Sequence, residues 1–145
     1  MNMQRWDWRG HAILLAEAEG EYVGKLKVGM WTIDTTYITM LGGYSKDFKT
    51  RNPWKHPSLL YTPKEFKGRR GGYVIQGAED HTGAVIDGFV FDKKLNNHYE
   101  SNGDLNYSKS DSTEFIWFAR PGCVIRNNVF VNAAFDTLRV ANGQL

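Results

Sequence analysis

An internal repeat constrains the fold of this chain more than any other feature of its sequence. The segment GAVIDGFVF, which begins at Gly83, aligns with GCVIRNNVF, which begins 39 residues later at Gly122. Five of the nine positions are identical, and a small residue, Ala84 or Cys123, fills the second position of both copies. A strand–turn–strand unit that keeps the same residue class at equivalent positions is typical of parallel strands stacked in successive coils.

The repeat predicts which apolar residues lie side by side. Stacked coils place equivalent positions about 4.8 Å apart. Ile86 should therefore stack on Ile125, and Phe91 on Phe130, as apolar ladders in the interior.

The same alignment makes two further predictions. Asp87 should lie beside Arg126 on the outer face, where the two side chains would form an opposite-charge pair between neighbouring strands. A weaker third copy of the repeat is MLGGY, residues 40–44, which we align with VIDGF, residues 85–89.

Two adjacent asparagines, Asn127 and Asn128, interrupt the second copy. Asparagine is a poor strand former and is costly to bury without a partner. It tolerates the left-handed backbone of tight corners, and its amide can bond to neighbouring backbone groups. The first copy has Gly88 at the place of Asn127, and glycine meets the same backbone demand. We therefore expect a corner here and not a catalytic pair.

The rest of the sequence is also typical of short strands. Short apolar runs alternate with glycine and asparagine. Only AILLAEAEGEY, residues 12–22, has a helix-forming composition, and it fits equally well a buried strand, AILLA, followed by a turn. A chain of 145 residues is long enough for one domain with a core. We expect one all-β domain over 1–145, with N-terminal coils over 11–61, a loop-rich basic segment over 46–72, coils over 73–92 and 115–145, and an inserted loop over 93–114.

Charge is distributed unevenly along the chain. The net charge of +2 is too small to argue for a nucleic-acid partner. Residues 1–72 hold 12 Lys and Arg against 7 Asp and Glu, and eight of these basic residues lie in 46–70. This segment is either a solvated loop region or an electropositive patch for an anionic partner such as an acidic polysaccharide.

The cysteine count, the lengths of the apolar runs and the opening segment exclude several further features. The single cysteine excludes an internal disulfide and a cysteine-based metal site. No apolar run approaches the roughly 18 residues that span a bilayer. The opening MNMQRWDWRG has no hydrophobic segment of the signal-peptide type.

The repeat, the strand pattern and one further segment resemble a known family. They are similar to right-handed parallel β-helix proteins of the pectate-lyase-like superfamily, above all to its bacterial surface and secreted members. The resemblance covers roughly 12–144 and implies an extracellular or cell-surface location. Because family members continue beyond the position of Leu145, we expect a fragment or a short member here. The further segment has the pattern GGY-S-x-D-F-x-x-R-x-P, formed by Gly42, Gly43, Tyr44, Ser45, Asp47, Phe48, Arg51 and Pro53.

The resemblance also implies candidate chemistry. Enzymes of this family act on polysaccharides in a groove along an outer sheet, as lyases or glycoside hydrolases. Hydrolysis needs two facing carboxyl groups, whereas a lyase needs a basic residue and can use Ca²⁺. No cofactor is expected otherwise. The weak catalytic candidates are Asp87, Asp92 and Arg126.

Aromatic residues suggest a binding role instead. Sugars stack on Trp and Tyr rings, while polar side chains fix their hydroxyl groups. No metal site is expected, because His11, His56, His81 and His98 show no ligand spacing, and Cys123 is interpreted as a buried spacer. The carbohydrate-binding candidates are Trp54, Lys55, His56, Tyr99 and Arg120.

These observations favour a secreted or cell-surface module that presents a binding surface to polysaccharide or to partner subunits. Nucleic acid and a membrane span are not expected. One alternative is a polysaccharide lyase or glycoside hydrolase. Another is an assembly subunit that stacks through an open end of its coils by strand addition.

Overall fold

The computed structural model describes residues 12–16, 22–23, 31–33, 37–61, 75–77, 83–93, 97–110, 114–118, 122–133 and 138–140. Within these residues the regular structure consists of strands and includes no helix, so this part of the chain is all-β, as predicted. The strands are β1 (Ala12–Ala16), β2 (Tyr22–Val23), β3 (Trp31–Ile33), β4 (Thr39–Tyr44), β5 (Ser58–Tyr61), β6 (Ile75–Gly77), β7 (Val85–Asp87), β8 (Phe89–Asp92), β9 (Ile116–Phe118), β10 (Val124–Arg126), β11 (Val129–Val131) and β12 (Leu138–Val140).

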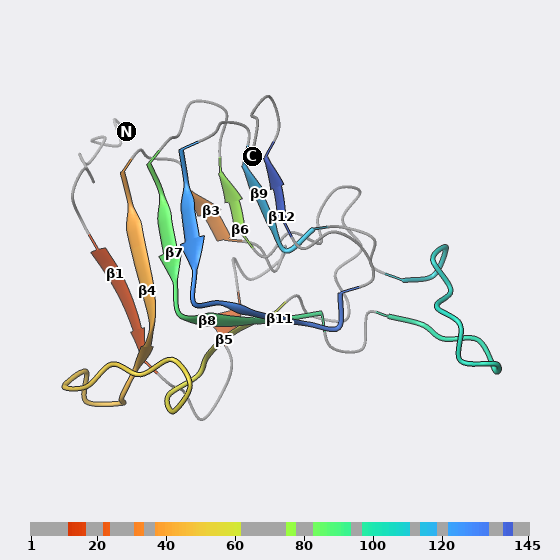
Figure 1. The fold of residues 1–145 in the computed structure, drawn as a ribbon, viewed down its shortest axis with the longest axis horizontal. Helices are drawn as coiled ribbons and strands as arrows, with labels where there is room; N and C mark the ends of the chain where they lie inside the picture. Colours follow the sequence, from red (N-terminus) through yellow and green to blue (C-terminus); the bar gives the residue numbers. More distant parts are fainter. Residues whose placement is uncertain are drawn as a thin grey trace, which may run out of the picture.

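The strands form three parallel four-stranded sheets (Figure 1). Sheet A has the order β1-β4-β7-β10, sheet B the order β2-β5-β8-β11, and sheet C the order β3-β6-β9-β12. Consecutive strands therefore visit sheets A, B and C in turn. Each set of three strands makes one circuit, and each circuit pairs with the next through all three sheets.

The register of the third and fourth circuits follows the internal repeat. Ile86 pairs with Ile125, and Phe91 pairs with Phe130. The rings of Phe91 and Phe130 are stacked, with centroids 5.1 Å apart and planes inclined by 11°. These are the pairs that an offset of 39 residues predicts.

The second circuit is shifted by one residue from the alignment of MLGGY with VIDGF. Met40 pairs with Ile86, and Leu41 pairs with Asp87, whereas the alignment places Met40 beside Val85. A slip of one residue would turn every side chain of the strand to the opposite face. Because Met40 and Ile86 are both buried, the observed register keeps both in the core, and the expected alignment is wrong for the paired strand residues. Its match of Gly43 with Gly88 agrees with the backbone, since both glycines have a φ of 85°.

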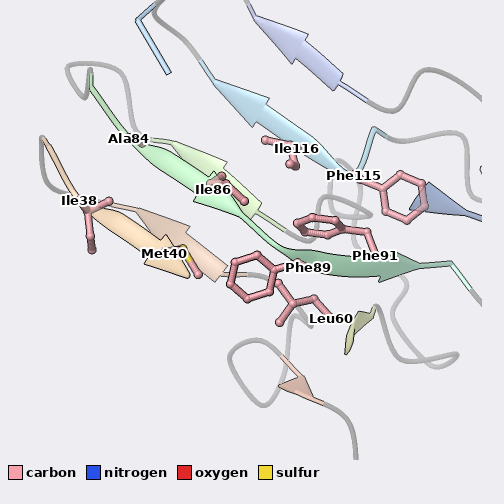
Figure 2. Packing of buried hydrophobic residues seen from close by; sticks show 9 residues of the cluster. All are labelled: Ile38, Met40, Leu60, Ala84, Ile86, Phe89, Phe91, Phe115 and Ile116. Carbon is pink, nitrogen blue, oxygen red and sulfur yellow. The ribbon is translucent and has the colours of Figure 1, made fainter. Parts of the chain in front are cut away.

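Apolar side chains from the three sheets meet in one core (Figure 2). Alternate residues of β5 and β8 are buried, as the two-residue period of a strand requires. Cys123 is partly buried against this core. Full burial of an aliphatic or aromatic side chain contributes about 1.5–3 kcal/mol. The core residues are Ile38, Met40, Leu60, Ala84, Ile86, Phe89, Phe91, Phe115 and Ile116.

Residues with a left-handed backbone stack at the corners between sheets. Before sheet A, the positive φ angles are 57° at Tyr37, 74° at Gly83 and 96° at Gly122. Between sheets A and B, they are 85° at Gly88 and 54° at Asn127. Glycine adopts this conformation without a Cβ penalty, and asparagine tolerates it. The left-handed corner that the two asparagines predicted is therefore present in the third circuit, at Gly88, and in the fourth circuit, at Asn127.

Two loops interrupt the circuits. Residues 45–57 connect β4 with β5, and the second loop, described over 97–110, connects β8 with β9. Strand β5 lies where the expected N-terminal coils over 11–61 overlap the expected loop-rich segment over 46–72. No helix in the described residues is long and apolar enough to cross a membrane.

Candidate functional site

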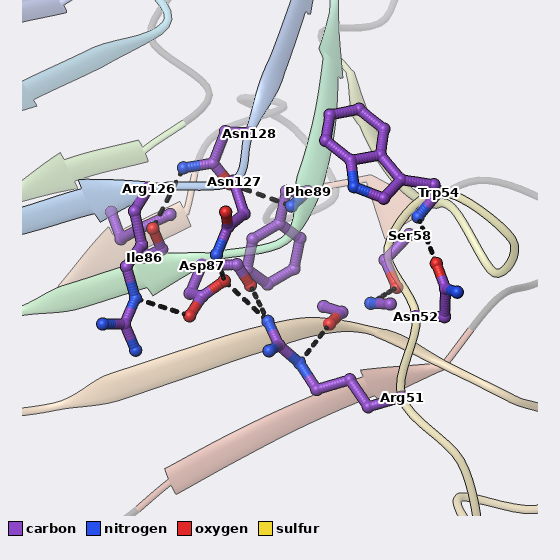
Figure 3. A network of polar contacts seen from close by, with 12 residues as sticks. Arg51, Asn52, Trp54, Ser58, Ile86, Asp87, Phe89, Arg126, Asn127 and Asn128 are labelled. Atoms are coloured by element: carbon purple, nitrogen blue, oxygen red, sulfur yellow. Dashed lines mark hydrogen bonds and ion pairs between the residues drawn. The ribbon is translucent and has the colours of Figure 1, made fainter.

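A polar network fills the corner between sheets A and B (Figure 3). Its centre is Asp87, whose side chain is 2% exposed. Arg51 Nη2 donates to Asp87 Oδ1 at 2.7 Å, and Arg126 Nε donates to Oδ2 at 2.8 Å. Asn127 Nδ2 also donates to Oδ1, at 3.0 Å. Both carboxylate oxygens are thus engaged.

The pairing of Asp87 with Arg126 agrees with the repeat, but the expected exposed position of Asp87 is wrong. The reason is the loop of residues 45–57, which brings Arg51 onto the carboxylate. Arg126 itself remains 61% exposed. The network gives Asp87 a structural role at the corner.

The ionisation of Asp87 reflects two opposing effects. Burial raises the pKa of its carboxyl group, and the hydrogen bonds from Asn127, Arg51 and Arg126 lower it. The lowering effects together dominate, so the pKa lies below its ordinary value. The charged form is therefore the one that the folded corner stabilises.

The asparagine amides complete the corner. Asn128 Oδ1 accepts a hydrogen bond from Phe89 N–H at 2.9 Å, and Asn128 Nδ2 donates to the Ile86 carbonyl oxygen at 3.0 Å. Each amide thus bonds to the third circuit from the fourth, as expected for a corner. Farther along, Asn132 Nδ2 donates to Asp92 Oδ1 at 2.6 Å.

Two glycines, Gly43 and Gly88, make room for the loop of residues 45–57 to dock. Arg51 Nε donates to the Gly42 carbonyl oxygen at 2.9 Å. A Cβ at Gly88 would lie 2.6 Å from Arg51 Nη2 and 2.8 Å from Pro53 Cγ. A Cβ at Gly43 would lie 2.6 Å from Pro53 Cα. The Gly-Gly and Arg-x-Pro parts of the sequence pattern therefore fit against each other.

The first half of this loop is held by a polar turn. Ser45 N–H donates to the Thr50 carbonyl oxygen at 2.9 Å, and Thr50 N–H donates to Ser45 Oγ at 3.1 Å. Ser45 Oγ donates to Asp47 Oδ1 at 2.7 Å. Phe48 has a positive φ of 60°, and its ring lies 6.0 Å from that of Tyr44.

The second half is a turn capped by Asn52. Its Oδ1 accepts hydrogen bonds from the backbone N–H groups of Trp54 and Lys55 at 3.1 and 3.2 Å. Its carbonyl oxygen accepts further bonds from Lys55 and His56 N–H. This turn projects Trp54, whose side chain lies apart from the Arg51–Asp87 contact in Figure 3.

The loop of residues 45–57, called the Trp54 loop below, presents aromatic and basic side chains on a fixed backbone. Trp54 is 72% exposed and Phe48 is 48% exposed. The surrounding exposed cations are Lys46, Lys49 and Lys55. Such a surface can stack on a flat apolar face and attract anionic groups at its rim.

The structure separates the predicted carbohydrate-binding residues. Trp54, Lys55 and the half-buried His56 lie in the Trp54 loop. Tyr99 is 63% exposed and belongs to the loop described over 97–110, on the opposite side of the molecule (Figure 1). Arg120 lies outside the described residues, as do His11 and His81.

Sequence reasoning missed the roles of Arg51 and Phe48 in this site. Both residues stand in the GGY-S-x-D-F-x-x-R-x-P pattern, so their spacing from Gly42 and Gly43 was the available signal. The docking contact itself joins Arg51 to Asp87, which lies 36 residues away.

The described part of the chain can be compared with what a metal site and a reactive thiol require. No group of three or more His, Cys, Asp or Glu side chains is placed there to hold a metal ion. Burial raises the pKa of the Cys123 thiol, which disfavours the thiolate that nucleophilic attack requires.

No protein-family model, curated protein or solved structure matches this chain.

Proposed function

We propose that the chain is a right-handed parallel β-helix of the pectate-lyase-like type, and that its Trp54 loop binds an acidic polysaccharide at a cell surface or in the extracellular space. The alternation of strands among three parallel sheets supports the β-helix. Connections between parallel strands of one sheet are right-handed in nearly all proteins.

The exposure of Trp54 on a hydrogen-bonded loop is the observation that carries the binding proposal. A tryptophan that is 72% exposed contributes little to the core, whereas its ring can stack on the C–H face of a sugar. Asn52 fixes the backbone on which the ring stands. A loop that is already ordered loses less entropy when it binds.

Charge selects the class of polysaccharide. Lys46, Lys49 and Lys55 are exposed in the same loop as Trp54. Asp47 is the acidic residue of this loop, and its carboxylate lies 3.4 Å from Lys49 Nζ. The exposed lysines favour sugars that carry carboxylates. Because such contacts lie at the surface, added salt should weaken them.

Binding to polygalacturonate, alginate and neutral dextran tests the proposal. We expect saturable binding of the two acidic polymers, weakened by salt, and weaker binding of dextran. The substitution Trp54→Ala should lower the affinity about tenfold, since a well-placed contact residue contributes more than about 1 kcal/mol. Tyr37→Asn removes an exposed ring outside the loop, retains a residue that tolerates the left-handed φ, and should bind as the wild type does.

Equal affinity of Trp54→Ala and wild type for both acidic polymers would contradict the proposal, as would a preference for dextran. The lyase alternative predicts a rise in ultraviolet absorbance as unsaturated products form during the same incubation. A glycoside hydrolase predicts new reducing ends instead.

A second candidate function is assembly through the fourth circuit. Strands β10 and β11 lie at one edge of sheets A and B, and no described strand pairs with their outer side. Val124 of β10 is 46% exposed. A strand edge of this kind can pair with another strand. A concentration-dependent rise in molar mass, abolished by Val124→Lys, would support it, and a constant monomeric mass would contradict it.

A further inference from the structure

The loop of residues 97–110, called the Tyr107 loop below, repeats the backbone design of the Trp54 loop. An isolated antiparallel bridge lies at the base of each loop, Tyr44 with Arg51 at the Trp54 loop and Tyr99 with Leu105 at the Tyr107 loop. Three backbone hydrogen bonds then recur at matching places. Ser45 N–H donates to Thr50 O in the Trp54 loop, as Glu100 N–H donates to Asp104 O in the Tyr107 loop. Phe48 N–H donates to Ser45 O, as Gly103 N–H donates to Glu100 O. Asn52 N–H donates to Gly43 O, as Asn106 N–H donates to His98 O.

The capped turn recurs as well. Asn106 Oδ1 accepts from Lys109 N–H at 3.1 Å, as Asn52 Oδ1 accepts from Lys55 N–H at 3.2 Å. The carbonyl oxygen of Asn106 accepts from the N–H groups of Lys109 and Ser110. The shared sequence is Asn-x-x-Lys, so the two loops are built by the same local rule.

The Tyr107 loop also displays aromatic rings. Tyr107, next to the capping Asn106, is 59% exposed, and Tyr99 is 63% exposed. Its charge differs from that of the Trp54 loop, because Glu100 and Asp104 outnumber Lys109. Carboxylates accept hydrogen bonds from sugar hydroxyl groups but repel uronates.

The two loops lie at opposite ends of the strands of sheet B. The Trp54 loop leads into β5, and the Tyr107 loop follows β8, so in this parallel sheet they lie at the two ends of the strands (Figure 1). A strand of four residues such as β8 is on the order of 13 Å long. A ligand that touches both loops must therefore be longer than this strand.

The outer face of sheet B lies between the loops. Leu59 pairs with Val90, and Val90 pairs with Val129. These three side chains are partly exposed, while their neighbours Leu60 and Phe91 are buried. Together these three side chains form an apolar surface on which the C–H faces of a sugar chain can pack.

We propose that the Trp54 and Tyr107 loops hold one polysaccharide chain across sheet B, with acidic units at the Trp54 loop and uncharged units at the Tyr107 loop. This inference rests on the proposed function. It assigns the ligand to polysaccharides that carry charged and neutral sugars in one chain. Carboxymethyl cellulose of low substitution has this composition and serves as the probe.

The test compares the polymer with a short fragment. Affinities are measured for carboxymethyl cellulose and for its disaccharide bearing one carboxymethyl group, with the wild type, Trp54→Ala and the double variant Tyr99→Ala/Tyr107→Ala. Linked contacts multiply affinity, so we expect the double tyrosine variant to bind the polymer at least tenfold more weakly and the disaccharide unchanged. Trp54→Ala should weaken both. Circular dichroism and the Tyr37→Asn variant control for folding.

The outcomes separate this inference from the proposed function. If the double tyrosine variant binds the polymer as the wild type does, the inference is wrong, and loss of binding in Trp54→Ala still supports the Trp54 loop. If the double variant weakens the binding of the disaccharide as much as that of the polymer, the tyrosines and Trp54 contact the same short segment of the ligand. That result would overturn the inference. If Trp54→Ala changes neither affinity, both proposals fail.

Discussion

At the residue scale, the corner between sheets A and B has one backbone requirement that two residue types satisfy. Gly88 meets it with a φ of 85° and Asn127 with a φ of 54°. Asn127 adds a hydrogen bond to Asp87, which a glycine lacks. Backbone conformation and side-chain chemistry can therefore be separated by substitution.

The first prediction uses two substitutions at Asn127. Asn127→Gly keeps the left-handed backbone and loses one hydrogen bond, so the free energy of unfolding should fall by about 1 kcal/mol. Asn127→Val loses the same bond and adds about 1–2 kcal/mol of backbone strain. Urea unfolding measures both. Equal losses in the two variants would show that the left-handed backbone is not a requirement.

The second prediction concerns acid and Asp87. Because the folded-state pKa lies below the unfolded value of about 3.9, ionised Asp87 stabilises the fold above that value. This stability is lost as the pH falls through the lower, folded-state pKa. Asp87→Asn should therefore be less stable than the wild type at pH 7, by about 1–3 kcal/mol. The difference should shrink below about pH 4.

Urea unfolding at pH 7 and at pH 3 measures the effect. A difference between wild type and Asp87→Asn that stays constant between these pH values would contradict the account, since the neutral asparagine cannot titrate.

At the scale of elements, the Trp54 loop is a folded unit that docks on the corner. Its docking depends on Gly88, where a Cβ would meet Arg51 and Pro53. Gly103 in the Tyr107 loop has a similar φ of 90°, but a Cβ there would meet nothing within 4 Å. The two glycines therefore share a left-handed backbone conformation and differ in packing.

The third prediction compares Gly88→Ala with Gly103→Ala. Both substitutions add left-handed strain of about 1–2 kcal/mol, but only the first should displace Arg51 and release the Trp54 loop. Trypsin should then cleave Gly88→Ala faster after Lys46 and Lys49, as mass spectrometry of the fragments can show. Cleavage at these lysines that is equally slow in both variants would argue against docking through Gly88.

The sequence predicted some elements well because their information is local or repeated. The offset of 39 residues predicts the pairs Ile86 with Ile125 and Phe91 with Phe130, and Asn127 marks a corner by its own conformational preference. The second circuit was misaligned because Gly42 and Gly43 offer two equivalent matches to Gly88. The burial of Asp87 could not be predicted, since it depends on where a loop residue, Arg51, docks in space.

At the scale of the whole molecule, the three sheets share one core, and stability should vary along the stack. The strands of the second and third circuits pair on both sides, whereas β10, β11 and β12 pair on one side. Ile125 and Phe130 are only partly buried, in contrast to Ile86 and Phe91. The fourth circuit thus adds less burial than the third.

The fourth prediction follows from this gradient. Amide hydrogen exchange should be slowest in β7 and β8 and faster in β10 and β11, because strands with partners on both sides open only with the larger unit. Exchange measured by mass spectrometry on peptides of 83–93 and 122–133 reports the difference. Equal protection of the two peptides would indicate that the fourth circuit is covered by a further structural element.

The central claim is that the Trp54 loop binds acidic polysaccharide, and the indole N–H signals of the five tryptophans test it most directly. The signal of Trp54 is assigned in a nitrogen-15-labelled sample from its loss in Trp54→Phe. On titration with short polygalacturonate oligomers, the account predicts a saturable shift of the Trp54 signal that exceeds the shift of every other indole and shrinks as salt is added. A Trp54 signal that stays fixed at saturating oligomer while another indole shifts would contradict the claim.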